Sequence, residues 1–377
     1  MVQLSESSLN TLRDRILAAV AAGSTLRIRG GGSKDGLSPA TPAAAPLDTG
    51  AHRGILSHEP GELVLTARAG TPLAEVEAAL AEHGQALAFE PPRLGSARAG
   101  TLGGAIASGL SGPARANAGA ARDFVLGVQA LNGKGELLTF GGQVMKNVAG
   151  YDLSRLLAGS WGHLAVLTEI SLKVLPLAPA EATLAFVLPQ EQALELLHSW
   201  GAQPLPLNAS RWQQHDDGPR LHLRLCGARA AVDAAVRMMT RQHGAILLQT
   251  EAASREWTAC RDQQLDFFTR PPEPDWCLWR LSVPQGTPAF TQPWPTLVEW
   301  HGGQRWLWAP CTGEQAATLH ALAAAAGGHA MLWQLPGDGS GAQLPRQAPL
   351  PVVQQRIHQG LKQAFDPHGI FAGGQAF

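Results

Sequence analysis

Three glycine-rich segments in the first half of the chain carry the residues best suited to hold a charged ligand. Their sequences are RGGGSKDG at 29–36, GTLGGAIASG at 100–109 and GSWGHLAVLTE at 159–169. Glycine adopts backbone geometries that other residues resist, and it lets main-chain N–H groups approach a ligand closely. One such segment is weak evidence, whereas three of them, each beside a regular element, predict a chain wrapped around one long, phosphate-bearing cofactor.

The first segment offers a hydroxyl group and a cation next to its glycines. It lacks the GK[ST] ending of a Walker A loop and the spacing of a GxGxxG turn. Ser33 can donate a hydrogen bond, and Lys34 can balance part of the roughly two negative charges of a pyrophosphate. A solvent-exposed turn is an equally good interpretation of this segment alone, because short glycine motifs recur by chance.

The second segment consists of small residues, which permit a helix or loop to lie against another backbone. Close packing without a ligand is one interpretation. The functional interpretation places Thr101, Ser108 and backbone N–H groups on the phosphates and sugar of the cofactor. Downstream, Gly119, Arg122 and Asp123 stand just before a predicted strand, where they either contact the cofactor or cap a turn.

Short strands and helices must position these segments. Apolar alternation and turn signals predict strands at 26–29, 62–68, 124–131 and 136–140. Asn132-Gly133, between the last two strands, is typical of a hairpin. An amphipathic N-terminal helix is expected to end at Gly23, and Thr71 is expected to cap a second helix whose first residue is Pro72.

The second half of the chain has a different organisation. LPLAPAEA at 175–182 is typical of a linker. Beyond it, strand-like and helix-like segments alternate, which predicts an α+β cap domain of ferredoxin-like units. Thr312 is expected to cap one of its helices, and a final helix is predicted at 352–365. The apolar face of that final helix consists of Val353, Ile357 and Leu361.

Composition limits the classes of function. The chain has 377 residues, of which 45% are apolar and 16% charged, and its formal net charge is −1. These values are typical of a globular protein and lack the positive field that non-specific nucleic-acid binding requires. No apolar run approaches the roughly 20 residues that span a bilayer. We expect a cytoplasmic protein with no transmembrane segment and no nucleic-acid partner.

The four cysteines, Cys226, Cys260, Cys277 and Cys311, are scattered and form no CxxC pair. This spacing argues against an iron–sulfur cluster or a structural zinc within the chain, so no metal site is predicted. We expect the cysteines to be reduced and buried rather than bridged.

Several motifs together resemble a known family. RGGGSK, GTLGG, RDFVLG and GSWGHLAVLTEISLKV are similar to the FAD-binding fold of the vanillyl-alcohol oxidase, or PCMH, type. KNVAGYDLSRLLAGSWGHL at 146–164 resembles the FAD-binding E subunits of bacterial glycolate oxidase complexes, and FDPHGIF after the final helix is similar as well. The resemblance covers residues 20–175 strongly and the cap weakly.

This resemblance implies an α+β fold with three parts. A two-part PCMH-type FAD-binding domain is expected at 1–176, and an α+β ferredoxin-like cap domain at 177–348. The C-terminal helix, at 349–377, is expected to return to the FAD-binding domain and pack on it.

The resemblance also implies which residues hold FAD. The loop that cradles the pyrophosphate matches Gly30, Gly31, Gly32, Ser33 and Lys34. The second phosphate-side segment matches Thr101, Gly103 and Gly104. The border of the adenine or flavin side matches Gly159, Ser160, Gly162, Leu164 and Val166. With Ser108, Gly119 and Asp123, these residues form the candidate cofactor site.

A further box of the family matches Lys146, Asn147 and Tyr151. Tyr151 is either a hydroxyl donor near the flavin or a buried aromatic residue with one hydrogen bond. No motif marks a histidine as a covalent flavin anchor, so FAD is expected to be bound non-covalently.

Two departures from the family concern catalysis and the chain end. Related enzymes that oxidise 2-hydroxy acids carry an HxGDGNxH motif, whereas LPGDGS at 335–340 lacks both histidines. His329 is the nearest histidine, and a lone histidine beside apolar residues is more often structural. Relatives end in Phe-Asn-Pro-Gly, whereas this chain has FAGG at 371–374.

Oxidation of a hydroxy acid needs a base for the hydroxyl proton and a cation for the carboxylate. Candidate cations in the second half include Arg211, Arg220, Arg224, Arg280 and Arg305. No base–cation pair stands out from the spacing, so no catalytic residue is assigned.

The resemblance implies an FAD-binding subunit of a glycolate oxidase complex, which oxidises a small 2-hydroxy acid together with a sister flavin subunit and an iron–sulfur subunit. Contact with the inner membrane would then come through those partners. Two alternatives stay open. One is a stand-alone FAD-dependent oxidoreductase of a hydroxy acid or sugar, and the other is a non-catalytic assembly subunit with a vestigial FAD groove.

Overall fold

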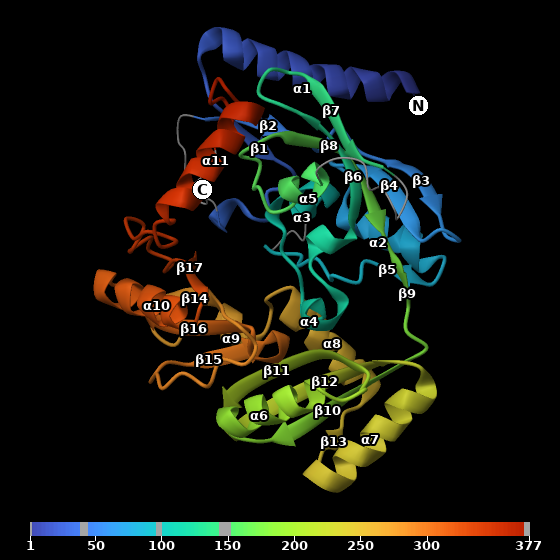
Figure 1. Ribbon diagram of the computed structural model, residues 1–377, viewed down its shortest axis with the longest axis vertical. Helices are drawn as coiled ribbons and strands as arrows, with labels where there is room; N and C mark the ends of the chain where they lie inside the picture. Colours follow the sequence, from blue (N-terminus) through green and yellow to red (C-terminus); the bar gives the residue numbers. More distant parts are fainter. Residues whose placement is uncertain (1, 38–43, 96–99, 143–151, 373–377) are drawn as a thin grey trace. The chain divides into compact units, whose positions relative to one another are not determined.

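A computed structural model describes all residues except 1, 38–43, 96–99, 143–151 and 373–377 (Figure 1). The described chain forms two compact units. Unit 1 comprises Met1–Ser111, Ala120–Leu177 and Leu350–Phe377, and unit 2 comprises Gly112–Gly119 and Ala178–Pro349. The predictions for Lys146, Asn147 and Tyr151 fall outside the described residues.

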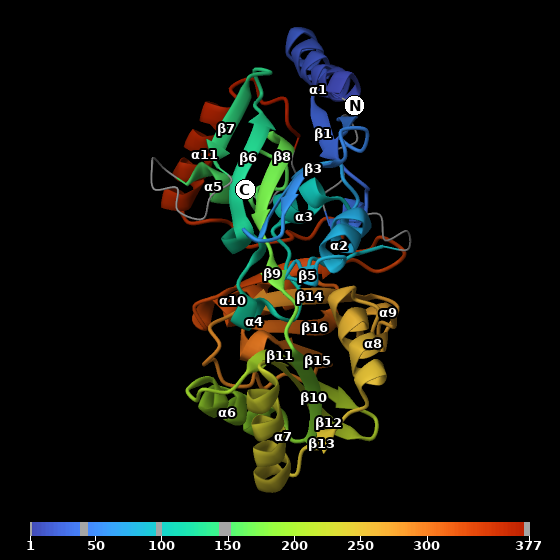
Figure 2. The same ribbon diagram turned by 90° about the vertical axis from the view of Figure 1, so that its right-hand side faces the viewer.

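Unit 1 is built on a five-stranded antiparallel sheet, whose strands lie side by side in Figure 2. Its order is β3 (Ile55–Glu59), β4 (Val64–Arg68), β8 (Val166–Lys173), β6 (Val125–Leu131) and β7 (Leu137–Gly141). The central strands β6 and β8 are mostly buried, as their β-branched and leucine side chains favour. The predicted hairpin is confirmed, because β6 and β7 pair from Leu131 with Leu137 onward.

A second layer of unit 1 contains the N-terminus. α1 (Val2–Ala22) packs Leu12 and Ile16 against a parallel pair of strands, β1 (Leu26–Arg29) and β2 (Ala45–Asp48). The predicted N-terminal helix and first strand are therefore confirmed, with Gly23 in the left-handed region at φ 60°. β1 leads directly into the first glycine segment.

The remaining elements of unit 1 are short. Its helices are α2 (Leu73–Ala81), α3 (Leu102–Ser108), α5 (Leu153–Leu157) and α11 (Val352–Phe365), with 3-10 turns η1 (Asp35–Leu37) and η2 (Ala121–Phe124). β5 (Gln85–Ala86) pairs with β9 (Leu175–Pro176). The predicted cap of α2 is wrong. The hydroxyl of Thr71 donates to the carbonyl of Arg68 and accepts from the N–H of Gly54, so tertiary partners occupy it.

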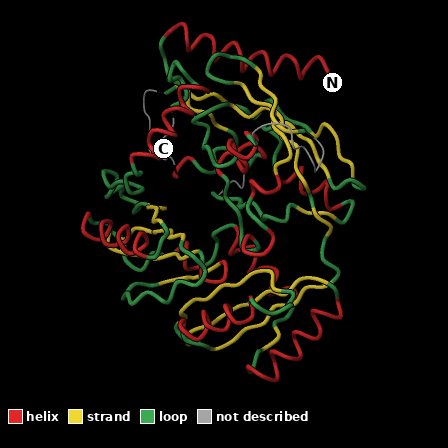
Figure 3. The backbone as a smooth tube through the Cα atoms, in the orientation of Figure 1, coloured by secondary structure: helices red, strands yellow, loops and turns green. Residues whose placement is uncertain are grey.

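Unit 2 is built on one eight-stranded antiparallel sheet (Figure 3). Its order is β13 (Ile246–Leu247), β10 (Ala180–Val187), β12 (Gly218–Gly227), β11 (Leu207–His215), β15 (Thr296–Glu299), β16 (Gln304–Pro310), β14 (Trp276–Ser282) and β17 (His329–Gln334). The predicted linker is shorter than expected, because β10 already begins at Ala180.

Helices cover both faces of this sheet (Figure 2). The apolar face packs against α6 (Gln190–Gly201), α7 (Arg229–His243) and α10 (Gly313–Ala325). The opposite face carries α8 (Thr250–Arg261) and α9 (Asp266–Thr269), and α4 (Arg115–Ala118) and η3 (Trp300–Gly302) complete the unit. The predicted cap of α10 is confirmed, since the Thr312 hydroxyl accepts from the N–H of Gln315.

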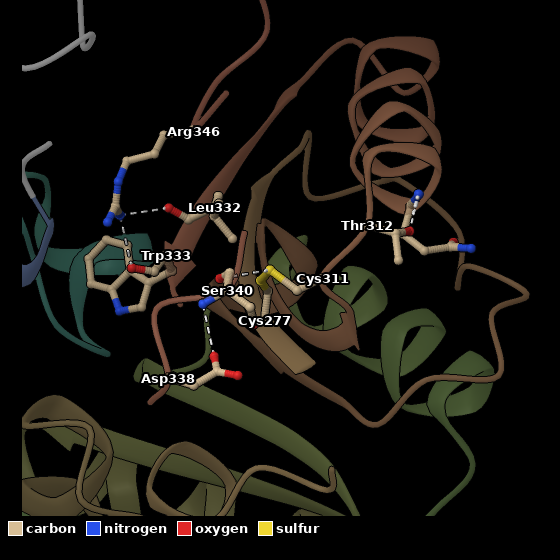
Figure 4. Close-up of a disulfide and its surroundings, with 9 residues drawn as sticks. Cys277, Cys311, Thr312, Leu332, Trp333, Asp338, Ser340 and Arg346 are labelled. Carbon is tan, nitrogen blue, oxygen red and sulfur yellow. Dashed lines mark hydrogen bonds between the residues drawn. A yellow bond between two sulfur atoms is a disulfide. The ribbon is translucent and has the colours of Figure 1, made fainter. Parts of the chain in front are cut away.

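One prediction about the cysteines is wrong. Cys277 on β14 and Cys311 after β16 form a disulfide (Figure 4). β14 and β16 are antiparallel neighbours in which Cys277 pairs with Ala309, two residues before Cys311. The fold thus brings together two cysteines that lie 34 residues apart in the chain, which their spacing does not reveal.

The end of the chain contacts the rest of unit 1 through Lys362, Ile370 and Phe371 rather than through the apolar face of α11. Val353 and Ile357 of that face are 67% and 56% exposed. Ile370 and Phe371 pack in the core with Leu26, and the Lys362 ammonium donates to the carbonyl of His163 at 2.8 Å. Within the tail, the Lys362 ammonium also donates to the Asp366 carboxylate at 2.7 Å. The Asp366 carboxylate also accepts from the N–H groups of Ile370 and Phe371, at 3.0 and 2.8 Å.

We expect Asp366→Ala to destabilise unit 1. Asp366 is 2% exposed, so its loss leaves two backbone N–H groups without their acceptor and the Lys362 ammonium without its counter-ion. The expected loss in the free energy of unfolding is about 2 to 4 kcal/mol. Urea unfolding followed by circular dichroism measures it. Asp266→Ala, which removes an exposed ion pair with Arg270, is the control and is expected to cost less than about 0.5 kcal/mol. Equal losses in the two variants would contradict the prediction.

Candidate functional site

A groove in unit 1 brings the first and second glycine segments together. It is lined by Ile28, Arg29, Gly30, Gly31, Gly32, Ser33, Lys34, Asp35, Thr101, Gly104, Ala107, Ser108 and Trp161. β1 supplies the first segment, and the N-terminal part and outer face of α3 supply the second. The five residues predicted to cradle a pyrophosphate therefore line one cavity with Thr101, Gly104 and Ser108.

Glycine is required where these two segments meet. A Cβ atom on Gly30 would overlap with Oγ1 of Thr101. That hydroxyl is not free to move, because it caps α3 by accepting from the N–H of Gly104 at 3.1 Å. A methyl group on Gly30 would therefore take up space in this cradle beside Thr101.

The third segment is hydrogen-bonded to the second through its backbone. The N–H groups of Gly159 and Trp161 donate to the carbonyls of Ile106 and Ala107, at 3.0 and 2.8 Å. A Cβ atom on Gly162 would lie 3.3 Å from Cβ of Ile28, just before the first segment. All three glycine segments thus converge.

Lys34 contributes a positive charge to the groove that no acidic side chain pairs with in the described chain. Asp35 forms ion pairs with Arg27 and Arg29, at 3.4 and 2.8 Å. No carboxylate of the described residues pairs with the Lys34 ammonium. Burial lowers the pKa of Lys34 to about 8, because the charged form loses hydration without gaining a partner. A desolvated cation beside a glycine cradle fits a pyrophosphate.

Other predicted residues lie beside the groove without lining it. Gly103 packs against Ala69, the residue after β4. A Cβ atom on Gly103 would lie 2.7 Å from Cβ of Ala69 and 2.9 Å from its carbonyl oxygen, so Gly103 is required by packing within the protein. Gly119 belongs to unit 2. The Asp123 carboxylate accepts from the N–H of Ala120, which is the turn-capping role.

The residues of the third segment that were predicted to bind FAD lie next to the groove but do not line it. They are Gly159, Ser160, Gly162, Leu164 and Val166. Leu164 and Val166 are buried, and Val166 packs with Leu26 and Leu47 beneath the first segment. The Ser160 hydroxyl donates to the carbonyl of Leu157 at 2.8 Å.

Trp161 is a groove residue that sequence reasoning missed. Its φ of 51° lies in the left-handed region, which non-glycine residues rarely adopt. The only signal in the sequence was its position between Gly159-Ser160 and Gly162.

The part of the chain that the structure describes holds no group of three or more His, Cys, Asp or Glu residues placed to bind a metal ion. None of its helices has the length and apolar character needed to cross a membrane.

Comparisons with known proteins agree with this geometry. The family described as FAD binding domain matches residues 7–141. Glycolate oxidase subunit GlcE of Escherichia coli (strain K12) is 41% identical over 367 residues, which is 97% of this chain and 96% of that protein. Glycolate oxidase subunit GlcD of Bacillus subtilis (strain 168) is 38% identical over 96 residues, or 26% of this chain and 20% of that protein.

A solved structure shows the same fold. Alkyldihydroxyacetonephosphate synthase superposes with a TM-score of 0.66 at 14% sequence identity, covering 96% of this chain and 74% of that one. This likeness confirms the predicted α+β, PCMH-type fold class. The matched FAD binding domain and the likeness to GlcE identify FAD as the cofactor of this chain.

We expect Gly30→Ala to weaken FAD binding. The added methyl group must displace the Thr101 hydroxyl and occupy the cradle, so FAD affinity should fall by about tenfold or more. Titration of the flavin-free protein with FAD, followed by flavin fluorescence, measures the change. Gly36→Ala is the matched control, because a Cβ atom there meets nothing within 4 Å. Equal affinities in the two variants would remove this contact from the site.

The affinity for FAD is expected to fall as the pH rises through about 8. Below that pH Lys34 is protonated and attracts the pyrophosphate, whereas above it the free protein must first take up a proton. The dissociation constant should rise by up to about tenfold per pH unit above pH 8. Titrations from about pH 7 to about pH 9.5 test this in the wild type and in Lys34→Met. The variant should bind more weakly and show a flat profile. A wild-type profile without slope would refute the role of Lys34.

Proposed function

The chain belongs to the family of glycolate oxidase subunit GlcE, and we propose from this premise that it is the FAD-binding subunit of a cytoplasmic complex that oxidises glycolate to glyoxylate. The observation that carries the proposal is the convergence of three glycine segments on Lys34 in a chain 41% identical to GlcE over nearly its whole length. We assign unit 1 as the FAD-binding domain, including α11, and unit 2 as the cap domain.

The residues of this chain bind the cofactor and exclude solvent around it. When bound, FAD supplies two-electron redox chemistry. Backbone N–H groups of Gly30 to Ser33 and the Lys34 ammonium hold the pyrophosphate, and Thr101 and Ser108 border it. Gly103, Gly159 and Gly162 act indirectly, because each permits the backbone contacts that place these groups together.

The proposed partners are a sister flavin subunit and an iron–sulfur subunit. Two relatives carry the names of different glycolate oxidase subunits, GlcE and GlcD, which supports a complex of several subunits. Oxidation of glycolate to glyoxylate releases two electrons and two protons. A flavin accepts both electrons, and an iron–sulfur cluster carries them onward singly.

The test compares the chain alone with the chain co-expressed with its partner subunits. The chain alone should purify with a flavin spectrum, and its melting temperature should rise on adding FAD, because a ligand at about 100-fold its Kd adds nearly 3 kcal/mol. The complex should oxidise glycolate with an artificial electron acceptor. Lys34→Met in this chain should lower both the flavin content and the turnover of the complex.

Each alternative has its own outcome in the same experiment. Full glycolate turnover by the isolated chain would favour a stand-alone oxidoreductase. Flavin-free protein with no thermal shift would favour an assembly subunit with a vestigial groove. Either result would contradict the proposal.

A further inference from the structure

The sheet of unit 2 carries its apolar core on one face and a row of polar residues on the other. Pairing across β11, β15, β16 and β14 places one row of polar residues on this face, namely Arg211, Glu299, Gln304 and Ser282. The adjacent row pairs Trp306 of β16 with Arg280 of β14. A face of this kind is unusual in a sheet buried by helices, because buried charge is costly.

Arg280 lies within a cage of three indole rings. Its guanidinium carbon is 5.4, 5.8 and 5.5 Å from the ring centroids of Trp300, Trp306 and Trp333. Its Nε donates to Oε1 of Gln304 at 2.8 Å. In the described chain, its two terminal nitrogens have no hydrogen-bond partner and it forms no ion pair. The side chain is partly exposed, so those nitrogens can still donate to a ligand.

The acidic residue of this face makes its hydrogen bonds to residues other than Arg280. The Glu299 carboxylate accepts from Cys260 Sγ at 3.2 Å, from Trp306 Nε1 at 2.6 Å and from Gln304 Nε2 at 3.0 Å. Burial raises the pKa of Glu299, which weakens it as a counter-ion. Burial and the charge of Arg115 lower the pKa of Arg280 to about 10, and the charge of Glu299 offsets part of this effect. Within the described chain, Arg280 therefore has no carboxylate at ion-pair distance.

A strained turn holds one wall of this cage. Trp300 and His301 both lie in the left-handed region, at φ 54° and 55°, which costs on the order of 1 kcal/mol or more for each. The Trp300 indole donates to the carbonyl of Gly112 at 2.9 Å, and the N–H of His301 donates to Ser210 Oγ at 2.9 Å. The Arg115 guanidinium also stacks on Trp300, 4.4 Å from its centroid. Strain of this kind persists mainly at ligand sites.

From these contacts we infer that Arg280 binds the carboxylate of a small hydroxy acid, with the indoles of Trp300, Trp306 and Trp333 excluding water from the pair. The inference rests on the proposed function, because it assigns recognition of the substrate's carboxylate to this chain. A guanidinium with two terminal nitrogens available matches the two oxygens of a carboxylate. The aromatic surroundings lower the local dielectric constant and strengthen that charge-assisted pair.

The experiment measures binding of oxalate, a carboxylate that cannot lose a hydride, to the full-length FAD-loaded chain. Calorimetry gives the affinity, and quenching of tryptophan fluorescence reports the cage. Wild-type protein should bind oxalate saturably, and Arg280→Met should lower the affinity by about tenfold or more. Arg280→Lys keeps the positive charge but lacks the two terminal nitrogens of a guanidinium, so its oxalate affinity should lie between those of the wild type and Arg280→Met.

Arg224→Met is the matched control. Arg224 lies on the same face, stacks 5.0 Å from the Trp257 centroid and donates to Asn208 at 2.6 Å. Its replacement should leave the oxalate affinity and the flavin content unchanged.

Two outcomes would overturn the inference. One is the absence of saturable oxalate binding to the wild type. The other is an unchanged oxalate affinity in Arg280→Met, provided that this variant keeps the wild-type melting temperature and flavin content. If Arg280→Met does not fold, an unchanged oxalate affinity in Arg280→Lys has the same meaning. A complex that fails to oxidise glycolate, while oxalate binding still depends on Arg280, would contradict the proposed function alone.

Discussion

The close approach of backbone to backbone, where three glycine segments meet in unit 1, is the constraint on which the cofactor site depends. Gly30 faces the Thr101 hydroxyl, and a Cβ atom on Gly109 would lie 3.0 Å from Cα of Gly159. Side chains at these points would push β1, α3 and the turn before β8 apart. The same close packing places the glycine backbone and the Lys34 side chain in one groove, so the packing that joins the elements also creates the anion site.

The end of the chain stabilises this convergence from a distance in sequence. The Lys362 ammonium, paired with Asp366, also donates to the carbonyls of His163 and Phe371, at 2.8 and 2.9 Å. His163 lies within the third glycine segment, and Leu26, in the strand before the first segment, donates from its N–H to the carbonyl of Ile370 at 2.7 Å. α11 and the residues after it therefore contact the third segment and the strand that leads into the first. Its departure from the family's Phe-Asn-Pro-Gly pattern leaves these described contacts intact, because they come before residue 372.

Local signals in the sequence predicted what local forces decide. The N-terminal helix, the hairpin at Asn132-Gly133 and the Thr312 cap all depend on residues a few positions apart, and all three are present. Non-local pairing produced the failures. The Thr71 hydroxyl is taken by Gly54, and Cys277 meets Cys311 only because β14 and β16 are neighbours.

The candidate site divides in the same way. The glycine loops and Lys34 were recognisable because their residue types are themselves unusual, and the structure places them in one groove. Gly103 looked identical to its neighbours in sequence, yet its contact is with Ala69, just after β4. Arg280 was one of several arginines, and only its cage of indoles distinguishes it from Arg224 or Arg305. Residue type is visible in a sequence, whereas the partner that gives it a role is not.

Residues with strained backbones occur at both proposed ligand sites. Six non-glycine residues of the described chain have φ in the left-handed region, and three of them, Trp161, Trp300 and His301, border these sites. Each is held by a backbone hydrogen bond from outside its own turn, such as Trp161 N–H to Ala107 and His301 N–H to Ser210. Trp300 is fixed at its ring as well, because its indole donates to the carbonyl of Gly112 at 2.9 Å. The strain in each turn is offset by these contacts, which hold Trp300 against Arg280 in one unit and the backbone of Trp161 beside the groove of Lys34 in the other.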